Sequence, residues 1–301
     1  MDAEIEKILF KFEKIKDNLN NYFIKREDVI DGILYAITIK KHGLLIGVPG
    51  VAKSYVLRCF SDHVTGLVYW EYLLTPSTTE EEIMGNFSVK SRQLSDELKR
   101  NTENRLPRAQ LAFCDEFFKA KAATLQSLLV AMSDGIFYNP SPEKIPLISL
   151  FGASNEKPGQ GSELEALYDR FLLRYEIKRL SDINDWIRLA NLKDYDNRNI
   201  TVNLLDIQKL QLYCKTITIS DDIKKEISLL VKMLIAKNVK ISERRFRWIL
   251  ELLRAVALYK HRDSVELEDF KNIYPALWTY STDQPLVVRE LRDHLNNRVK
   301  E

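Results

Sequence analysis

The sequence predicts an α/β fold, in which a mainly parallel β-sheet with helices on both faces is followed by a smaller domain of helices alone. Short apolar runs alternate with segments of helical periodicity up to about residue 180. Residues 182–300 keep the helical periodicity but show almost no β alternation. The length of 301 residues suits such a division. We therefore expect an α/β domain over residues 1–181 and a helical domain over residues 182–301.

The first part of the chain alternates helices with a strand. Residues 3–20 place apolar side chains at helical spacing opposite a charged face, which predicts an N-terminal helix over about residues 1–20. A second helix is expected from Glu27 to about Lys41. The apolar run Gly43–Ile46 predicts a buried strand that leaves into a turn rich in glycine, and helical periodicity resumes over Lys53–His63.

The rest of the first domain repeats this alternation. Three more strands are predicted, at Leu67–Leu73, Leu111–Cys114 and Leu147–Ala153. A helix is expected over about Ala120–Ser133. Gly135–Tyr138 and Lys144–Ile148 flank a proline-containing turn, which favours a small hairpin over about residues 135–146. In the second domain, the clearest helix is predicted over Glu243–Tyr259.

Composition narrows the classes of function. The formal net charge of +2 provides no bulk attraction to nucleic acid or to an acidic membrane. No run of about 18 apolar residues occurs, and the charged N-terminus lacks the apolar stretch of a signal peptide, so no membrane insertion is expected. The cysteines, Cys59, Cys114 and Cys214, show no spacing typical of disulfides or zinc, which favours a reducing, cytoplasmic location.

The strongest functional signal is a glycine-rich loop between a predicted strand and a predicted helix. It consists of Gly47, Val48, Pro49, Gly50, Val51, Ala52, Lys53 and Ser54. Glycines let backbone N–H groups approach phosphate oxygens, and the helix start adds a positive dipole end. Lys53 would reach the β- and γ-phosphates of ATP, and the Ser54 hydroxyl would bind Mg²⁺. Ala52 stands where a second glycine usually lies, and we expect it to be tolerated if its backbone is helical.

Two further strand ends supply groups suited to ATP hydrolysis. The predicted strand Leu111–Cys114 is followed by Asp115 and Glu116. Asp115 would hold the magnesium ion, directly or through water, and Glu116 would take a proton from the attacking water. Adjacent residues at a strand end point in different directions, so the two carboxylates can have different roles. The next strand along the chain leads to Asn155, whose amide would orient water beside the γ-phosphate.

These elements, in this order and with a helical tail, resemble an AAA+ ATPase of the MoxR family, and within it the RavA-like group. The matching segments are Gly47–Ser54, Cys114–Glu116, Ala153–Glu156, Glu165–Phe171 and Ile241–Phe246. The resemblance covers roughly residues 20–280, and alanine at the position of Ala52 is usual in that family. It implies that residues 1–181 form a P-loop AAA+ nucleotide-binding core and residues 182–301 a helical lid.

The resemblance also implies roles for single residues. In that family the loop is called Walker A, the acidic pair Walker B and the asparagine sensor 1. Arg170 would be offered to the γ-phosphate of a neighbouring subunit, and Arg244 would reach from the lid to the nucleotide in its own subunit. A guanidinium suits both tasks because it stays charged and bonds phosphate bidentately. Arg174 is an alternative to Arg170, and Arg245 is an alternative to Arg244.

The family further implies partners. Its members assemble as rings, most simply hexamers, with ATP at each boundary between subunits. Relatives act as chaperone-like remodelling ATPases and commonly work with proteins that carry a von Willebrand factor A domain. Residues 80–107 correspond to the helix-2 insert of related rings, and residues 135–146 to a hairpin before sensor 1, where a protein client would be engaged. Lys25 replaces the glycine of a short family motif at residues 24–27, so no nucleotide contact is assigned there.

Two other functions are compatible with parts of the sequence. Related AAA+ rings with comparable inserts translocate DNA, and the first insert contains Lys90, Arg92, Lys99 and Arg100, which equally suit a solvated loop. ATPase stimulation by single-stranded DNA, falling steeply with salt, would favour such a nucleic-acid motor. The other rival is a nucleotide-dependent scaffold that does not hydrolyse ATP. The presence of both Walker motifs and of the sensor 1 asparagine argues against it.

Overall fold

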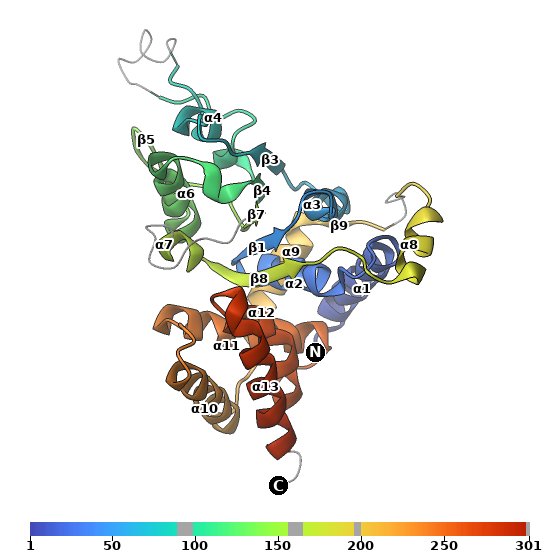
Figure 1. Cartoon of the computed structure of the whole chain (residues 1–301). Coiled ribbons are helices and arrows are strands. Elements are labelled where there is room, and N and C mark those ends of the chain that lie inside the picture. Colours follow the sequence, from blue (N-terminus) through green and yellow to red (C-terminus); the bar gives the residue numbers. More distant parts are fainter. Residues whose placement is uncertain (89–98, 156–164, 196–199, 299–301) are drawn as a thin grey trace.

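The structure, a computed structural model, describes residues 1–88, 99–155, 165–195 and 200–298. A parallel β-sheet flanked by helices occupies its centre, and helices from the C-terminal third of the chain lie below it in the view of Figure 1. Part of the expected insert at residues 80–107, including Lys90 and Arg92, lies outside the described residues.

Five parallel strands form the sheet in the order β3-β4-β7-β1-β8. They are β1 (His42–Gly47), β3 (Tyr69–Leu73), β4 (Leu111–Asp115), β7 (Ser149–Ser154) and β8 (Phe171–Ile177). The middle strands β4, β7 and β1 are buried along almost their whole length, as expected when helices cover both faces of a parallel sheet. The predicted α/β class, with a helical domain after the sheet, is confirmed.

β8 is not among the strands that the sequence predicts. It pairs with β1 along its whole length and adds the fifth strand at that edge of the sheet. Arg174 interrupts its apolar run, yet this side chain is completely buried. Burial is tolerated because the guanidinium donates hydrogen bonds to the backbone oxygens of Trp278 at 2.6 Å and Tyr168 at 3.0 Å.

The described helices of the first domain are α1 (Ala3–Tyr22), α2 (Glu27–Ile39), α3 (Lys53–Asp62), α4 (Glu80–Met84), α6 (Ala122–Asp134) and α7 (Glu165–Tyr168). Four of them, α1, α2, α3 and α6, lie where helical periodicity predicts them. The short helices α4 and α7 are not predicted. Asp2 caps the start of α1, because its carboxylate accepts a hydrogen bond from the N–H of Glu4 at 3.1 Å. Its apolar positions recur every three to four residues and are buried, with α2 among the elements that they contact.

Short strands and turns lie outside the five-stranded sheet. β5 (Ile136–Asn139) and β6 (Ser141–Lys144) pair antiparallel within residues 135–146. The two-residue strands β2 (Val64–Thr65) and β9 (Val202–Asn203) pair parallel and tie the two parts of the chain together. Single 3₁₀ turns lie at η1 (Leu106–Arg108), η2 (Phe117–Lys119) and η4 (Ser281–Asp283).

The second part of the chain is helical. Its elements are α8 (Ile183–Ala190), α9 (Leu204–Cys214), α10 (Asp221–Ala236), α11 (Glu243–Tyr259), the 3₁₀ helix η3 (Leu267–Ile273), α12 (Tyr274–Leu277) and α13 (Gln284–Arg298). The boundary expected between residues 181 and 182 falls between β8 and α8. α11 has the predicted bounds, and the Ser242 hydroxyl caps it by accepting from the N–H of Arg245. No helix in the described part of the chain is long and apolar enough to cross a membrane.

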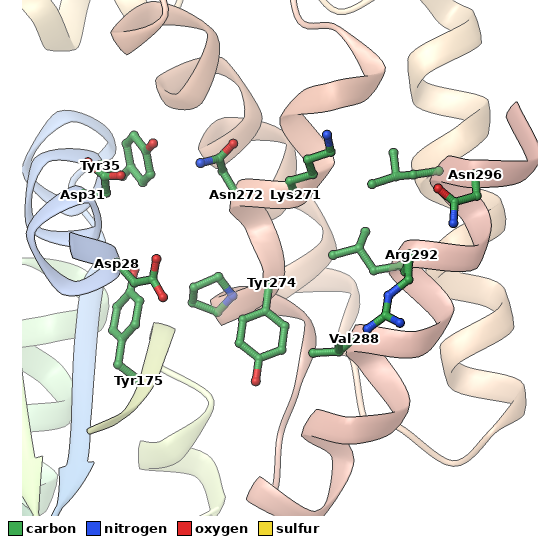
Figure 2. Close-up of a pocket in the computed structure, with 13 residues that line it drawn as sticks. Asp28, Asp31, Tyr35, Tyr175, Lys271, Asn272, Tyr274, Val288, Arg292 and Asn296 are labelled. Atoms are coloured by element: carbon green, nitrogen blue, oxygen red, sulfur yellow. The ribbon is translucent and has the colours of Figure 1, made fainter. Parts of the chain in front are cut away.

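A cavity of about 360 Å³ lies where α2 and β8 meet η3, α12 and α13 (Figure 2). Asp28 and Asp31 of α2 line one side, and Lys271 and Arg292 line the other side (Figure 2). Burial raises the pKa of Asp31, although this carboxylate pairs with Lys16 at 2.5 Å. No residue of the glycine-rich loop lines this cavity.

Candidate nucleotide site

The glycine-rich loop joins the end of β1 to the start of α3. Gly47 must lack a side chain, because a Cβ there would lie 2.5 Å from the backbone oxygen of Ile177 on β8. Gly50 has a φ of +80°, which glycine adopts at little cost. Ala52 is also left-handed, with φ +64° and ψ +31°. We expected alanine to be tolerated here if its backbone were helical in the usual right-handed sense. Ala52 does not have that backbone, and it therefore carries strain of about 1–2 kcal/mol.

The Lys53 side chain lies inside the loop. Its ammonium donates hydrogen bonds of 2.6 Å to the backbone oxygen of Gly47 and 2.6 Å to Oδ1 of Asn155. The residue is only 7% exposed. Burial lowers the pKa of Lys53, and the nearby carboxylates of Asp115 and Glu116 oppose this shift. The ammonium therefore lies near the carboxyl ends of β4 and β7, beside Asp115 and Asn155.

The acidic pair lies at the end of β4, where Asp115 is the last residue of the strand, and its two side chains point in different directions. Oδ1 of Asp115 accepts a hydrogen bond of 2.9 Å from the N–H of Glu116. Glu116 has a left-handed backbone with a φ of +51°. Its carboxylate accepts a hydrogen bond from Nδ2 of Asn155 and lies 3.4 Å from the Lys119 ammonium. A strained conformation held by specific contacts is typical of functional sites.

The sheet order explains why these groups meet. β7 lies between β1 and β4, so Asn155 at its end stands between Lys53 and Glu116. The Asn155 amide bridges them, since its oxygen accepts from Lys53 and its nitrogen donates to Glu116. The carboxyl ends of parallel strands are the usual place for ligands in such sheets. Ser54, the second residue of α3, is half-buried at the same edge.

Arg170 lies at the other end of the sheet. It immediately precedes β8, whose first residue pairs with the first residue of β1, whereas the loop leaves the last residue of β1. Seven residues of strand separate the two ends by about 20 Å. Nε of Arg170 donates a 3.0 Å hydrogen bond to the hydroxyl of Ser133, and the side chain is partly exposed. Burial, followed by the charge of Arg244, lowers the pKa of Arg170.

Arg244 is brought beside Arg170 and not beside the loop of its own chain. It lies in the first turn of α11 and is exposed. The start of α11 is attached next to Arg170, because Asp169 accepts hydrogen bonds from Arg245 at 2.8 Å and from the Ser242 hydroxyl at 3.1 Å. Arg244 therefore lies with Arg170, at the opposite end of the sheet from the loop that it was expected to reach in its own subunit.

The two alternative arginines are interior residues. Arg245 is 2% exposed and forms the ion pair with Asp169. Arg174 is fully buried, and burial lowers its pKa to about 9. Arg245 is thus engaged by Asp169, and the buried Arg174 guanidinium is not presented to solvent, as a group that reaches another subunit would have to be.

A cavity of about 470 Å³ adjoins the loop, and sequence reasoning did not find it. Its walls come from the α1–α2 connection, the loop, α3, the segment after β8, and α8. The lining residues are Tyr22, Phe23, Ile24, Arg26, Pro49, Gly50, Val51, Ala52, Tyr55, Arg179, Leu180, Trp186, Leu189 and Leu192. Arg26 contacts the loop directly, because its Nε donates a hydrogen bond to the backbone oxygen of Val51 at 3.3 Å. The aromatic rings beside a phosphate loop suit a nucleoside base.

One signal in the sequence does mark this cavity. The short family motif at residues 24–27 contains Arg26, which contacts the loop. Lys25 does not line the cavity and forms an ion pair with Asp185 of α8. The rest of the lining is spread from Tyr22 to Leu192, so no local pattern assembles it.

A phosphate loop, an acidic pair and a polar residue on neighbouring strand ends, followed by a helical domain, define the AAA+ class of ATPases. The family model described as the MoxR domain in MoxR-vWA-beta-propeller ternary systems matches residues 10–210. A model for the AAA lid domain matches residues 207–291. The chain therefore belongs to the MoxR family of AAA+ ATPases.

Similar proteins agree with this assignment. An uncharacterized protein of Methanocaldococcus jannaschii is 34% identical over 304 residues, which span 99% of this chain and 77% of the relative. A second uncharacterized protein of that organism is 34% identical over 267 residues, spanning 88% of this chain and 71% of the relative. A crystal structure described as a candidate ATPase of Cytophaga hutchinsonii has a TM-score of 0.77 at 19% identity and covers 96% of both chains, which shows the same fold.

Proposed function

We propose that this chain is a Mg²⁺-dependent ATPase of the RavA-like group, which hydrolyses ATP at the boundaries between subunits of a ring, most simply a hexamer. The observation that carries the proposal is that the candidate catalytic groups of one chain lie at two opposite ends of its strands. Lys53, Asp115, Glu116 and Asn155 meet at the carboxyl ends of the strands, whereas Arg170 lies at the amino end of β8. A second copy is needed to supply the arginine.

The residues at the loop edge fit ATP with magnesium. Backbone N–H groups of the loop and the Lys53 ammonium would bind the phosphates, whose oxygens would replace the acceptors that Lys53 now uses. The Ser54 hydroxyl and the Asp115 carboxylate are hard oxygen ligands of the kind that Mg²⁺ prefers. A bound Mg²⁺ ion would neutralise charge on the β- and γ-phosphates.

The same edge holds groups for the hydrolytic step. The Glu116 carboxylate would accept the proton of the attacking water, and the Asn155 amide would hold that water in line with the γ-phosphate. Asn155 already contacts Glu116, which fixes both side chains before substrate binds. The aromatic cavity beside the loop would receive the adenine.

Arg170 would complete the site of the neighbouring copy. Its guanidinium would stabilise the charge that develops on the γ-phosphate in the transition state. Arg244, which lies beside Arg170, would act on that same neighbour, in place of the contact within its own subunit that the family resemblance suggests. A trans arginine of this type contributes about 10³–10⁵ in rate in related phosphoryl-transfer systems.

The cellular role that we propose is chaperone-like remodelling of a protein client or partner. The matching family model is described from systems that pair a MoxR domain with a vWA protein, so a partner with a von Willebrand factor A domain is the first choice. The hairpin β5–β6 and the insert around α4 would contact the client. Three free, buried cysteines suit a reducing compartment such as the cytoplasm.

The test combines two inactive variants. Lys53→Ala removes phosphate binding, and Arg170→Ala removes the trans arginine but keeps the loop. Each variant alone should lose most steady-state release of phosphate from Mg-ATP. An equimolar mixture should regain activity, because about a quarter of randomly formed boundaries combine an intact loop with an intact arginine.

The mixture also shows which part of the proposal fails. If the Arg170→Ala chain binds a fluorescent ATP analogue and assembles, yet the mixture stays inactive, the trans role is wrong. If the wild-type chain neither binds nor hydrolyses Mg-ATP, the assignment of the whole site is wrong. Single-stranded DNA is added in a parallel reaction, and stimulation that disappears with salt would instead support a nucleic-acid motor.

A further inference from the structure

α8 presents an apolar face that nothing in the described part of the chain covers. Four of its eight residues are large apolar side chains with substantial exposure, including Ile183 at 69% and Ile187 at 52%. Asp185 on the opposite side of the helix is buried and pairs with Lys25 of the α1–α2 connection. A contiguous exposed apolar patch of this kind marks a binding surface.

The nucleotide would cover only one side of this face. Trp186 and Leu189 line the cavity beside the phosphate loop, but Ile183 and Ile187 do not. Ile183 and Ile187 are four residues apart and therefore stand one above the other on the same side of the helix. These two side chains therefore remain available to a macromolecular partner.

A groove of about 580 Å³ lies on the other side of the molecule. It is formed between the C-terminal end of α10, the N-terminal end of α11 and the segment around η4. Its apolar lining includes Tyr168, Ile235, Ile241 and Tyr280, and Ile235 is 49% exposed. Because its lining also includes Asp169, the groove adjoins Arg170.

β8 joins these two surfaces. The strand begins immediately after Arg170, beside the groove, and the chain reaches α8 shortly after the strand ends (Figure 1). Figure 1 shows β8 running from α7 at one side of the molecule toward α8 at the other. Two different surfaces on opposite sides of one chain support a head-to-tail contact, which repeats from copy to copy and closes a ring when the rotation allows.

We propose that α8 of one copy docks through Ile183 and Ile187 into the groove of the next copy. The inference rests on the proposed function and names the surfaces that bring its subunits together. Because α8 lines the nucleotide cavity and the groove adjoins Arg170, this contact brings the arginine of one copy to the loop of the other. Charge agrees with the pairing, since the exposed Asp182 precedes Ile183 and the exposed Lys240 precedes Ile241.

Assembly of surface variants tests the contact. Ile187→Asp places a charge on α8, and Ile235→Asp places one at the rim of the groove. Both positions are exposed, so both variants should fold with an unchanged circular dichroism spectrum and melting midpoint. Sedimentation velocity should show each variant as a monomer where the wild-type chain assembles, with turnover at least tenfold lower. Leu212→Asp, on the exposed side of α9, is the matched control and should assemble like the wild-type chain.

Cross-linking tests the head-to-tail direction. The native cysteines are buried, so Ile187→Cys and Ile235→Cys would each add one accessible thiol. A bismaleimide should join a mixture of the two single variants into covalent dimers and should leave each variant alone largely unlinked. A chain with both changes should yield a ladder of higher oligomers. Linking of Ile187→Cys to itself as efficiently as in the mixture would show a two-fold contact and overturn the proposal.

The outcomes separate this inference from the proposed function. If the wild-type chain hydrolyses Mg-ATP while both aspartate variants assemble and turn over normally, the docking surfaces are wrong and the ATPase assignment stands. If the wild-type chain assembles through these surfaces but does not bind Mg-ATP, the docking inference stands and the ATPase assignment fails. A wild-type chain that stays monomeric at every concentration, with and without nucleotide, overturns the docking inference.

Discussion

The side chains of Lys53 and Asn155 are joined by a hydrogen bond of 2.6 Å between the ammonium and the amide oxygen, across 102 positions in the sequence. The same amide donates to Glu116, so one asparagine connects the residue that would bind phosphate to the residue that would activate water. β7 makes this connection by lying between the strands that carry the other two groups.

Asn155→Ala should separate binding from turnover. The variant loses the bridge to Lys53 and Glu116 but keeps the loop, so we expect the Kd for Mg-ATP to change less than tenfold. Turnover should fall by about 10²–10³, as when other preorganised polar groups are removed from a transition state. Equilibrium binding and steady-state phosphate release measure the two effects. Asn272→Ala, in the cavity of Figure 2, is the matched control, and equal turnover in both variants would exclude the proposed role.

Arg174→Met should affect folding, unlike Arg170→Ala. The buried Arg174 guanidinium serves two backbone oxygens, at Trp278 and Tyr168, and each buried group left without a partner costs about 1–3 kcal/mol. Urea unfolding should show a clear loss of stability for Arg174→Met and little change for Arg170→Ala. A stable Arg174→Met chain that has lost turnover would identify Arg174 as the catalytic arginine.

Ala52→Gly should stabilise the protein. The left-handed backbone of Ala52 is costly for alanine and easy for glycine, so the substitution should raise the free energy of unfolding by about 1 kcal/mol. Ala190→Gly, at the end of the right-handed helix α8, is the matched control and should have the opposite sign. Thermal unfolding of the two variants measures the difference. A lower melting midpoint for Ala52→Gly would show that the loop does not carry this strain in solution.

His42 should make the protein sensitive to mild acid. Its Nε2 lies 2.9 Å from the backbone oxygen of Met132, and its Nδ1 accepts from the N–H of Leu150 at 3.0 Å, as expected for a neutral ring. Burial lowers the pKa of His42 to about 4 from 6.5. The unfolded chain therefore binds the proton more readily between these values, and stability falls as the pH decreases from 6.5 to about 4.

The pH effect can be isolated by substitution. A shift of this size corresponds to a loss of up to about 3 kcal/mol, which ends below the folded-state pKa. Denaturant unfolding at a series of pH values should give a steeper decline for the wild-type chain than for His42→Gln. Parallel pH dependences in the two proteins would mean that another group is responsible.

Most of the sheet, and the grouping of Lys53, Asp115 and Asn155 at one end of it, were predictable because their signals are local. Each predicted strand is a short apolar run. Asp115 directly follows one such run, Asn155 lies two residues past another, and Lys53 lies in the glycine-rich loop that follows a third. β8 escaped prediction because Arg174 breaks its apolar pattern, and only tertiary contacts with backbone oxygens make that arginine acceptable in the core. Residues 1–20 and 243–259 were predictable as helices because their periodicity extends over several turns.

Other features depend on contacts between residues that are far apart in the sequence, which no local pattern predicts. The left-handed backbone of Ala52 follows from closure of the loop, which propensity alone does not reveal. The aromatic cavity joins Tyr22 and Trp186, which meet only after the sheet has formed. Arg244 lies beside Arg170 because Asp169 binds the start of α11, and this contact places Arg244 away from the loop that it was expected to reach.

The position of β8 has a consequence for open and closed assemblies. Each copy carries Arg170 just before this strand and a phosphate loop beside the strand's other end. If Arg170 acts on the neighbouring copy, a linear string of copies ends with one loop that lacks its arginine. With arginines that act on the neighbour, a pair of copies would have one complete catalytic centre, whereas a closed circle would have one for every copy. Closing the circle would therefore add a working centre without any change in the fold of a single copy.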